Sequence, residues 1–182
     1  MNSGAHPSSE GLSSMQRHRC DGLSSLARMP HSRYFGSIAP EADCVEQSIT
    51  LGEDRVRLDL NILAPTTLAQ SEIDRVDATL DELASVDALA RAAIASAISD
   101  DAQQPAQFWQ FHHDEVPGYE SLARDEMHAA LALKRVGFYP DGAHGVRSFV
   151  LLDYAARGPA TDQLLVVKLS RDGAVDAIAW ES

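Results

Sequence analysis

The sequence has few cysteines, no long hydrophobic run and a shortage of basic side chains. Cys20 and Cys44 are the only cysteines among 182 residues, too few for a disulfide scaffold, so free thiols in a reducing cytoplasm are expected. A membrane-spanning helix is excluded because it needs about 18 consecutive apolar residues. The 15 basic residues stand against 27 acidic ones, and the net charge of −12 argues against nucleic-acid binding, which needs a positive surface.

Residues 1–33 differ in composition from the rest of the chain. They contain eight serines and four arginines but only two acidic residues. Their apolar residues are too sparse to offset the entropy lost on folding. We therefore expect either a disordered tail or a gene start that has been assigned too far upstream. A transit peptide is the other interpretation of this composition. Residues 34–182 are then expected to form a single domain, in which 25 acidic residues outnumber 11 basic ones.

Period-two alternation predicts β-strands at both ends of this domain. Residues 44–51 and 55–62 are predicted to form a hairpin, because apolar and polar residues alternate strictly in the second segment and a short glycine-containing link joins the two. Four further strands are expected to form a C-terminal meander, in which Asp172-Gly173 is a two-residue hairpin turn. These four strands are predicted at 136–139, 148–154, 163–169 and 174–180.

Helical spacing of apolar residues appears between the two groups of strands. Residues 71–100 are predicted to form two helices with a break near 85–87, where Asp87 would cap the second helix. A third helix runs from Pro105 to about Glu115, and a short fourth begins at Asp125. The expected fold class is α+β. We predict a single antiparallel sheet, made of the N-terminal hairpin and the four-strand meander, with an inserted block of three to four helices packed on one face.

Short motifs in the last fifty residues and near the start of the domain form a pattern. They are L-A-L-K-R-V-G-F-Y-P-D-G at 131–142, F-V-L-L-D-Y at 149–154, T-D-Q-L-L-V-V-K at 161–168, D-G-A-V-D-A-I-A-W-E-S at 172–182, Y-F-G at 34–36 and R-L-D-L-N at 57–61. From about Tyr34 to Ser182 the chain resembles an uncharacterised bacterial family, domain of unknown function two-thousand-and-four. The resemblance implies one α/β domain in a bacterial cytoplasm, and no established activity or site residue.

Acidic side chains gather in the helical block and suggest a binding surface. Attraction between opposite charges speeds the encounter of two proteins, so this surface is expected to meet a basic partner. The function expected is that of a non-catalytic, acidic cytosolic protein-binding module, such as an immunity-type antagonist of a basic protein. The predicted interaction surface comprises Glu72, Asp74, Asp77, Asp81, Glu82 and Asp87.

Two further carboxylates are candidates for burial in the sheet. Asp153 interrupts an apolar strand and Asp162 precedes another. A carboxylate in a sheet interior needs a partner or a shifted pKa, and Lys168 or Arg147 is the expected partner. The alternative is that these acids lie on the wet face of a one-sided sheet.

Two other functions stay open at this point. A small hydrolase with an unrecognised site would draw on Asp153, His128 and His144, and a small-ligand-binding domain would need no chemistry at all. The chain contains no catalytic motif, so no catalytic residue and no cofactor are predicted. The run at 112–115 lacks the H-x-x-x-H spacing of a helical zinc site, so no metal site is predicted. Cys44 is interpreted as a small buried hydrophobic residue rather than a nucleophile.

Overall fold

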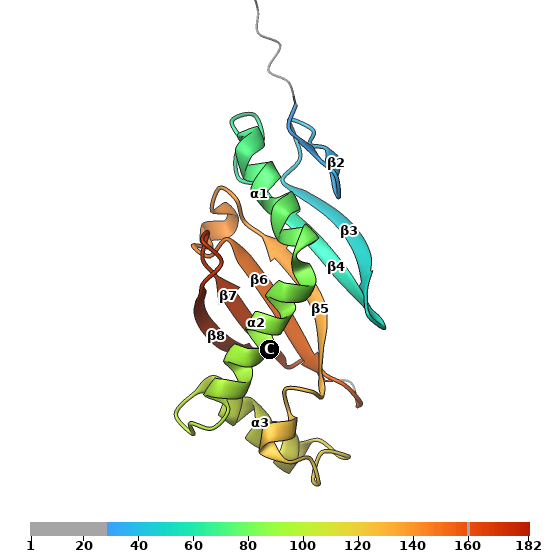
Figure 1. Cartoon of the computed structure of the whole chain (residues 1–182), viewed down its shortest axis with the longest axis vertical. Coiled ribbons are helices and arrows are strands. Elements are labelled where there is room, and N and C mark those ends of the chain that lie inside the picture. The colour runs from blue at the N-terminus through green and yellow to red at the C-terminus, as the bar shows by residue number, and fades with distance from the viewer. Residues whose placement is uncertain (1–28, 160) are drawn as a thin grey trace, which may run out of the picture.

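A computed structural model describes residues 29–159 and 161–182, and it has the α+β architecture that the sequence predicts (Figure 1). This part of the chain forms three α-helices, a six-stranded sheet and a separate two-stranded sheet. In chain order the elements are β1 (His31–Ser32), β2 (Gly36–Ser37), β3 (Cys44–Leu51), β4 (Asp54–Asn61), α1 (Gln70–Asp81), α2 (Leu83–Ala97), α3 (Gln104–Glu115), a 3-10 turn (Arg124–Glu126), β5 (Leu131–Phe138), a second 3-10 turn (Ala143–Gly145), β6 (Val150–Ala156), β7 (Leu164–Leu169) and β8 (Val175–Glu181).

The large sheet is mixed, so the prediction of a single antiparallel sheet is wrong in this respect. Its strand order is β3-β4-β5-β6-β7-β8, and every neighbouring pair is antiparallel except β4 and β5, which are parallel. The helices between β4 and β5 carry the chain back to the end of the sheet where β4 starts, and such a crossover is what parallel neighbours require. β1 and β2 pair only with each other. Alternation within one strand encodes which side chains are buried, but it does not encode the direction of the neighbouring strand.

α1 and α2 lie across one face of the large sheet, and α3 lies near one end of the sheet, at the bottom of the view (Figure 1). Ile73 of α1 and Ile94 of α2 are fully buried in one core cluster with Leu58 of β4. At the other edge, the rings of Phe108 in α3 and Trp180 in β8 meet edge to face, with centroids 6.3 Å apart. Burial of this shared apolar surface is the main force that holds the helical block on the strands.

Two helix boundaries differ from the sequence-based expectation. The break between α1 and α2 lies at Glu82 rather than at 85–87, and the expected fourth helix is only the 3-10 turn Arg124–Glu126. Asp87 does not cap a helix. Its carboxylate accepts a hydrogen bond of 2.7 Å from the Tyr154 hydroxyl and forms an ion pair of 2.9 Å with Arg91, one turn further along α2.

The folded structure includes residues that the sequence analysis grouped with the N-terminal segment. Ser32 is fully buried, and its hydroxyl donates a 2.5 Å hydrogen bond to Asp77 of α1. The next backbone amide, that of Arg33, donates to the other oxygen of the same carboxylate at 2.9 Å. Residues 31–33 are therefore anchored to α1. The interpretations of the segment before them concern residues 1–28, which lie outside the described residues.

Candidate functional site

The face of the large sheet opposite the helices carries polar side chains in lateral rows. Because side chains alternate between the two faces of a strand, residues that pair across strands share a face. The register pairs Ser48 with Arg57, Arg57 with Arg135, and Arg135 with Asp153. Four neighbouring strands therefore contribute one continuous row to the uncovered face.

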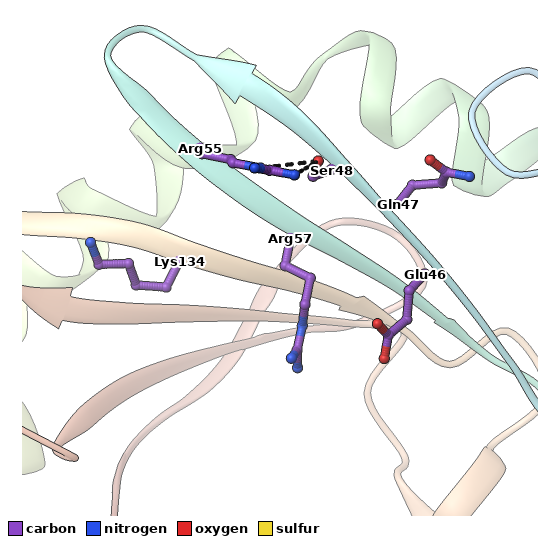
Figure 2. Close-up of a pocket in the computed structure, with 6 residues that line it drawn as sticks. All are labelled: Glu46, Gln47, Ser48, Arg55, Arg57 and Lys134. Atoms are coloured by element: carbon purple, nitrogen blue, oxygen red, sulfur yellow. Dashed lines mark hydrogen bonds between the residues drawn. The ribbon is translucent and has the colours of Figure 1, made fainter.

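Two adjoining hollows open on this face. The larger, of about 450 Å³, is lined by Glu46, Gln47, Ser48, Arg55, Arg57 and Lys134 (Figure 2). The smaller, of about 280 Å³, shares Arg57 and Lys134 with it and continues to Arg135, Asp153 and Leu164. We call the two hollows together the basic trough, after Arg55, Arg57, Lys134 and Arg135. Its walls come from strands on both sides of the parallel β4–β5 junction.

Arg135 forms the fixed end of the basic trough. Its Nε donates to Asp153 at 2.9 Å, its Nη1 to Asp59 at 3.3 Å and its Nη2 to the Tyr139 hydroxyl at 3.1 Å. Both carboxylates are buried. Burial raises the pKa of Asp153, and the nearby Arg135 charge acts in the opposite direction. The guanidinium is thus held by three partners and has a structural role.

A glycine makes room for this arginine. A Cβ atom built on Gly137 would lie 2.9 Å from Nη1 of Arg135 and 3.1 Å from the ring of Tyr139. Both distances are shorter than ordinary van der Waals contact, so any side chain here would displace the guanidinium or the ring. Arg135, Gly137 and Tyr139 therefore form a packing unit on the uncovered face.

The other three cations of the basic trough keep donors free. The Arg55 guanidinium donates only to the Ser48 hydroxyl, at 3.1 and 3.3 Å, and pairs with no acid among the described residues. Arg57 forms one 3.0 Å bond to Asp59, and its side chain is 57% exposed. Lys134 is exposed and forms no ion pair within the described part of the chain. Their unused N–H groups point to an anionic ligand, because guanidinium and ammonium groups bind carboxylates and phosphates.

The carboxylates predicted as an interaction surface mostly bind groups of their own chain. Glu72 pairs with Arg171, Asp77 with Ser32 and Arg33, Asp81 with Arg33 and Tyr34, and Asp87 with Arg91 and Tyr154. The hydrogen bonds from Arg33 and Tyr34 lower the pKa of Asp81. Asp74, which accepts a bond from Gln70, and Glu82 have no cationic partner among the described residues. Four of the six predicted residues therefore stabilise the fold.

The two candidate buried carboxylates have different outcomes. Asp153 lies on the uncovered face, as the alternative interpretation has it, but it is buried there. Its partner is Arg135 rather than Lys168 or Arg147, because the β5–β6 register sets Arg135 directly beside it. Lys168 pairs instead with Glu181 at 2.9 Å. Asp162 is exposed, since it lies in the segment before β7 and not in the strand. The prediction of burial is thus wrong for Asp162.

The residues of a hypothetical hydrolase do not come together. His128 precedes β5 and His144 follows it, so the length of that strand separates them, and Asp153 lies in the middle of β6. Cys44 is exposed at the start of β3, so the prediction of a small buried residue is wrong. Partial desolvation and the nearby carboxylates, Asp59 first among them, raise the pKa of its thiol, which makes it a poor nucleophile. No catalytic constellation follows from these positions.

His112 is a buried core residue. Its Nδ1–H donates to the Phe108 carbonyl at 2.9 Å, and burial lowers its pKa. The neighbouring His113 faces Asp114 instead. Within residues 29–159 and 161–182, no group of three His, Cys, Asp or Glu side chains is placed to hold a metal ion. In the same ranges, no helix is long and apolar enough to cross a membrane.

No protein-family model, no curated protein and no solved structure matches this chain.

The basic trough itself was missed by the sequence analysis. Arg55 and Arg57 were recognised only as the polar half of an alternating strand, and Lys134-Arg135 lay just before the strand predicted at 136–139. A signal was present, since an acidic chain with 15 basic residues places four of them in two short runs, R-V-R and K-R.

Proposed function

We propose that this chain is a non-catalytic protein-binding module whose partner presents an acidic segment to the basic trough. The proposal rests on three cations that keep N–H donors free. Arg55, Arg57 and Lys134 border a hollow of about 450 Å³ on a helix-free face, and two of them have no acidic partner among the described residues. By contrast, four of the six carboxylates that were predicted as an interaction surface already bond to groups of their own chain.

The acidity of the rest of the protein does not prevent this interaction. Charges are screened over about 8 Å at physiological ionic strength, so a carboxylate in the trough interacts mainly with the cations that border it. A small apolar ligand fits less well, because such ligands occupy pockets with mostly apolar walls. All six residues that line the larger hollow are polar or charged.

The proposal includes the compartment and the family. Two cysteines, of which Cys44 is a free thiol, support a reducing cytoplasm. Membership of the uncharacterised bacterial family rests on the motifs at 131–142 and 149–154. The binding test of the basic trough depends on neither the compartment nor the family.

The test is a binding titration with charged peptides. A fluorescent, glutamate-rich nonapeptide and a lysine-rich peptide of equal length are titrated with the protein at two salt concentrations. We expect the glutamate-rich peptide to bind more tightly, and Arg57→Glu to weaken it by roughly tenfold or more because an attractive charge becomes a repulsive one. Arg147→Glu is the matched control, since Arg147 is an exposed arginine in the β5–β6 connection and not in the trough.

Three outcomes would overturn the proposal. Preference for the lysine-rich peptide, lost in Glu82→Lys, would return the site to the helical block and its basic partner. Binding of inorganic phosphate with no binding of either peptide, again abolished by Arg57→Glu, would make the trough a site for a small anion. Equal effects of Arg57→Glu and Arg147→Glu would also contradict a local site, because only net charge would then matter.

A further inference from the structure

The outer edge of β3 has unpaired backbone groups. In an antiparallel pair, alternate residues bond to the neighbouring strand and the others face away. The amide of Ile62 donates to the Asp43 carbonyl at 2.8 Å, which sets the alternation along β3. Glu46, Ser48 and Thr50 therefore direct their N–H and C=O groups away from β4. No other described residue forms a hydrogen bond with these groups.

The opposite edge of the sheet, β8, is blocked. The backbone amide of Trp180 donates to the side-chain oxygen of Gln104 in α3. The β7–β8 register shifts where Leu169 pairs with Val175, which leaves Asp176 outside the ladder. A helix over the edge and an irregular register are both ways in which proteins prevent unwanted strand pairing.

β3 has almost none of these protections. Its sequence, C-V-E-Q-S-I-T-L, contains no proline and no lysine, and Glu46 is its only charged residue. Eight consecutive residues pair with β4 without a register shift. Valine, isoleucine and threonine favour extended backbone, so the strand is a regular template for another strand.

We propose that the partner binds by adding an extended segment along β3, so that the six-stranded sheet gains another strand. This deepens the proposed function and rests on it. The Arg55 guanidinium lies over Ser48, which brings one cation of the basic trough to the outermost strand (Figure 2). A side chain opposite Ser48 in the added strand would share the uncovered face with it, with Cβ atoms about 5 Å apart.

This geometry specifies the chemistry of the added segment. Acidic side chains fit opposite Ser48 and Thr50, because Arg55 pairs with Thr50 in the register and bonds to Ser48. An acidic side chain does not fit opposite Glu46, which would repel it. On the other face, the positions beside Val45 and Ile49 adjoin the core, so apolar residues fit there. The partner segment thus alternates acidic and apolar residues.

The experiment uses a blocked peptide of alternating valine and glutamate and the full chain. Amide hydrogen exchange is measured by NMR with and without the peptide. We expect new protection at the amides of Glu46, Ser48 and Thr50, and little change at Val45 and Gln47, which already bond to β4. Methylating the backbone nitrogens on one edge of the peptide keeps its charge but removes its donors, and should weaken binding by roughly tenfold or more.

A protein variant tests the same edge from the other side. Thr50→Pro removes one outward N–H and leaves the pairing with β4 intact, whereas Thr50→Ala keeps that N–H and serves as the control. Circular dichroism and thermal unfolding establish that both variants fold. The proline variant should bind the peptide several-fold more weakly than the alanine variant.

The possible failures are distinguishable. If the methylated peptide binds as tightly as the parent and Arg57→Glu still weakens both, strand addition is wrong while the acidic partner stands. If neither peptide binds and Arg57→Glu changes nothing, both proposals fail. If the chain alone is a dimer that Thr50→Pro converts to a monomer, the edge is occupied by a second copy, and the inference of a partner segment is overturned.

Discussion

The helical block and the uncovered sheet face carry opposite charges and use them in opposite ways. In the helical block, Asp77 and Asp87 are held by hydroxyl and cationic groups of their own chain. On the sheet face, Arg55 and Lys134 have no acidic partner among the described residues. In these two regions, the buried carboxylates serve the internal structure, and two cations of the basic trough keep donors for a ligand.

This contrast separates two quantities that a sequence does not distinguish. Net charge counts every ionisable group, whereas recognition depends on the groups whose hydrogen-bonding capacity is unused. The net charge of −12 led to the expectation of a basic partner. The acidic partner that we propose rests instead on the free donors of Arg55 and Lys134.

The largest expected loss of stability follows from removing a buried carboxylate of the helical block. Asp77→Ala removes the acceptor for the Ser32 hydroxyl and for the Arg33 amide and leaves a buried donor unpaired. We expect the free energy of unfolding to fall by about 2 to 3 kcal/mol, measured by urea denaturation. Asp74→Ala, at an exposed position of the same helix, is the control and should change stability by less than about 0.5 kcal/mol. Similar losses in the two variants would break the comparison.

A smaller loss is expected on the sheet face, at the packing unit around Arg135. Gly137→Ala brings a methyl group to within 2.9 Å of the guanidinium, so Arg135 must move away from Asp153 or Asp59. We expect a loss of about 1 to 3 kcal/mol in thermal or urea unfolding. The double variant Gly137→Ala/Arg135→Ala is informative, since Gly137→Ala should add little once the arginine is absent. An additive loss would show that the glycine acts independently of Arg135.

The third effect is a pH dependence that arises at neither charged surface. Burial lowers the pKa of His112 in the folded state, so the unfolded chain takes up a proton more readily. Stability from this group is complete above the unfolded pKa of about 6.5 and is lost as the pH falls toward the folded pKa. Denaturation between pH 7.5 and about 5.5 should show this decline. The decline should be shallower in His112→Gln, and an unchanged slope would contradict the assignment.

The smallest expected change in stability is at Lys134, and it tests directly whether this cation of the sheet face contributes to the fold. Lys134→Gln removes a charge that no described residue pairs with, so the free energy of unfolding should change by less than about 0.5 kcal/mol. The same variant should weaken binding of a glutamate-rich peptide severalfold, with the loss reduced at high salt. A stability loss comparable to that of Asp77→Ala would mean that Lys134 is part of the fold.

The parts of the fold that could be predicted are those that short local sequence patterns determine. The strict alternation of residues 55–62 placed the hairpin, and Pro105 marked the start of α3 within one residue. Asp172-Gly173 located the last turn. Each of these signals operates over a few residues, so one sequence is enough to detect it.

The parts that could not be predicted depend on which segments meet. Arg135 was not recognised as the partner of Asp153 because the pairing of β5 with β6 decides it. Asp87 resembled a helix cap, yet Tyr154 and Arg91 occupy its carboxylate. The basic trough has the same origin, since it requires β4 and β5 to be neighbours. Charge composition alone therefore pointed to a different surface.

The parallel junction between β4 and β5 also has a consequence for how the protein assembles. The hairpin and the C-terminal meander are built from contacts between near neighbours in the chain, whereas the junction joins distant segments, as in the bond from the Leu63 amide to Asp141, 78 residues away. Such closures come at a high entropic cost and slow folding. The two local units can therefore form before the junction between them closes. Since the trough spans this junction, a ligand bound there would hold the two halves together and slow their separation.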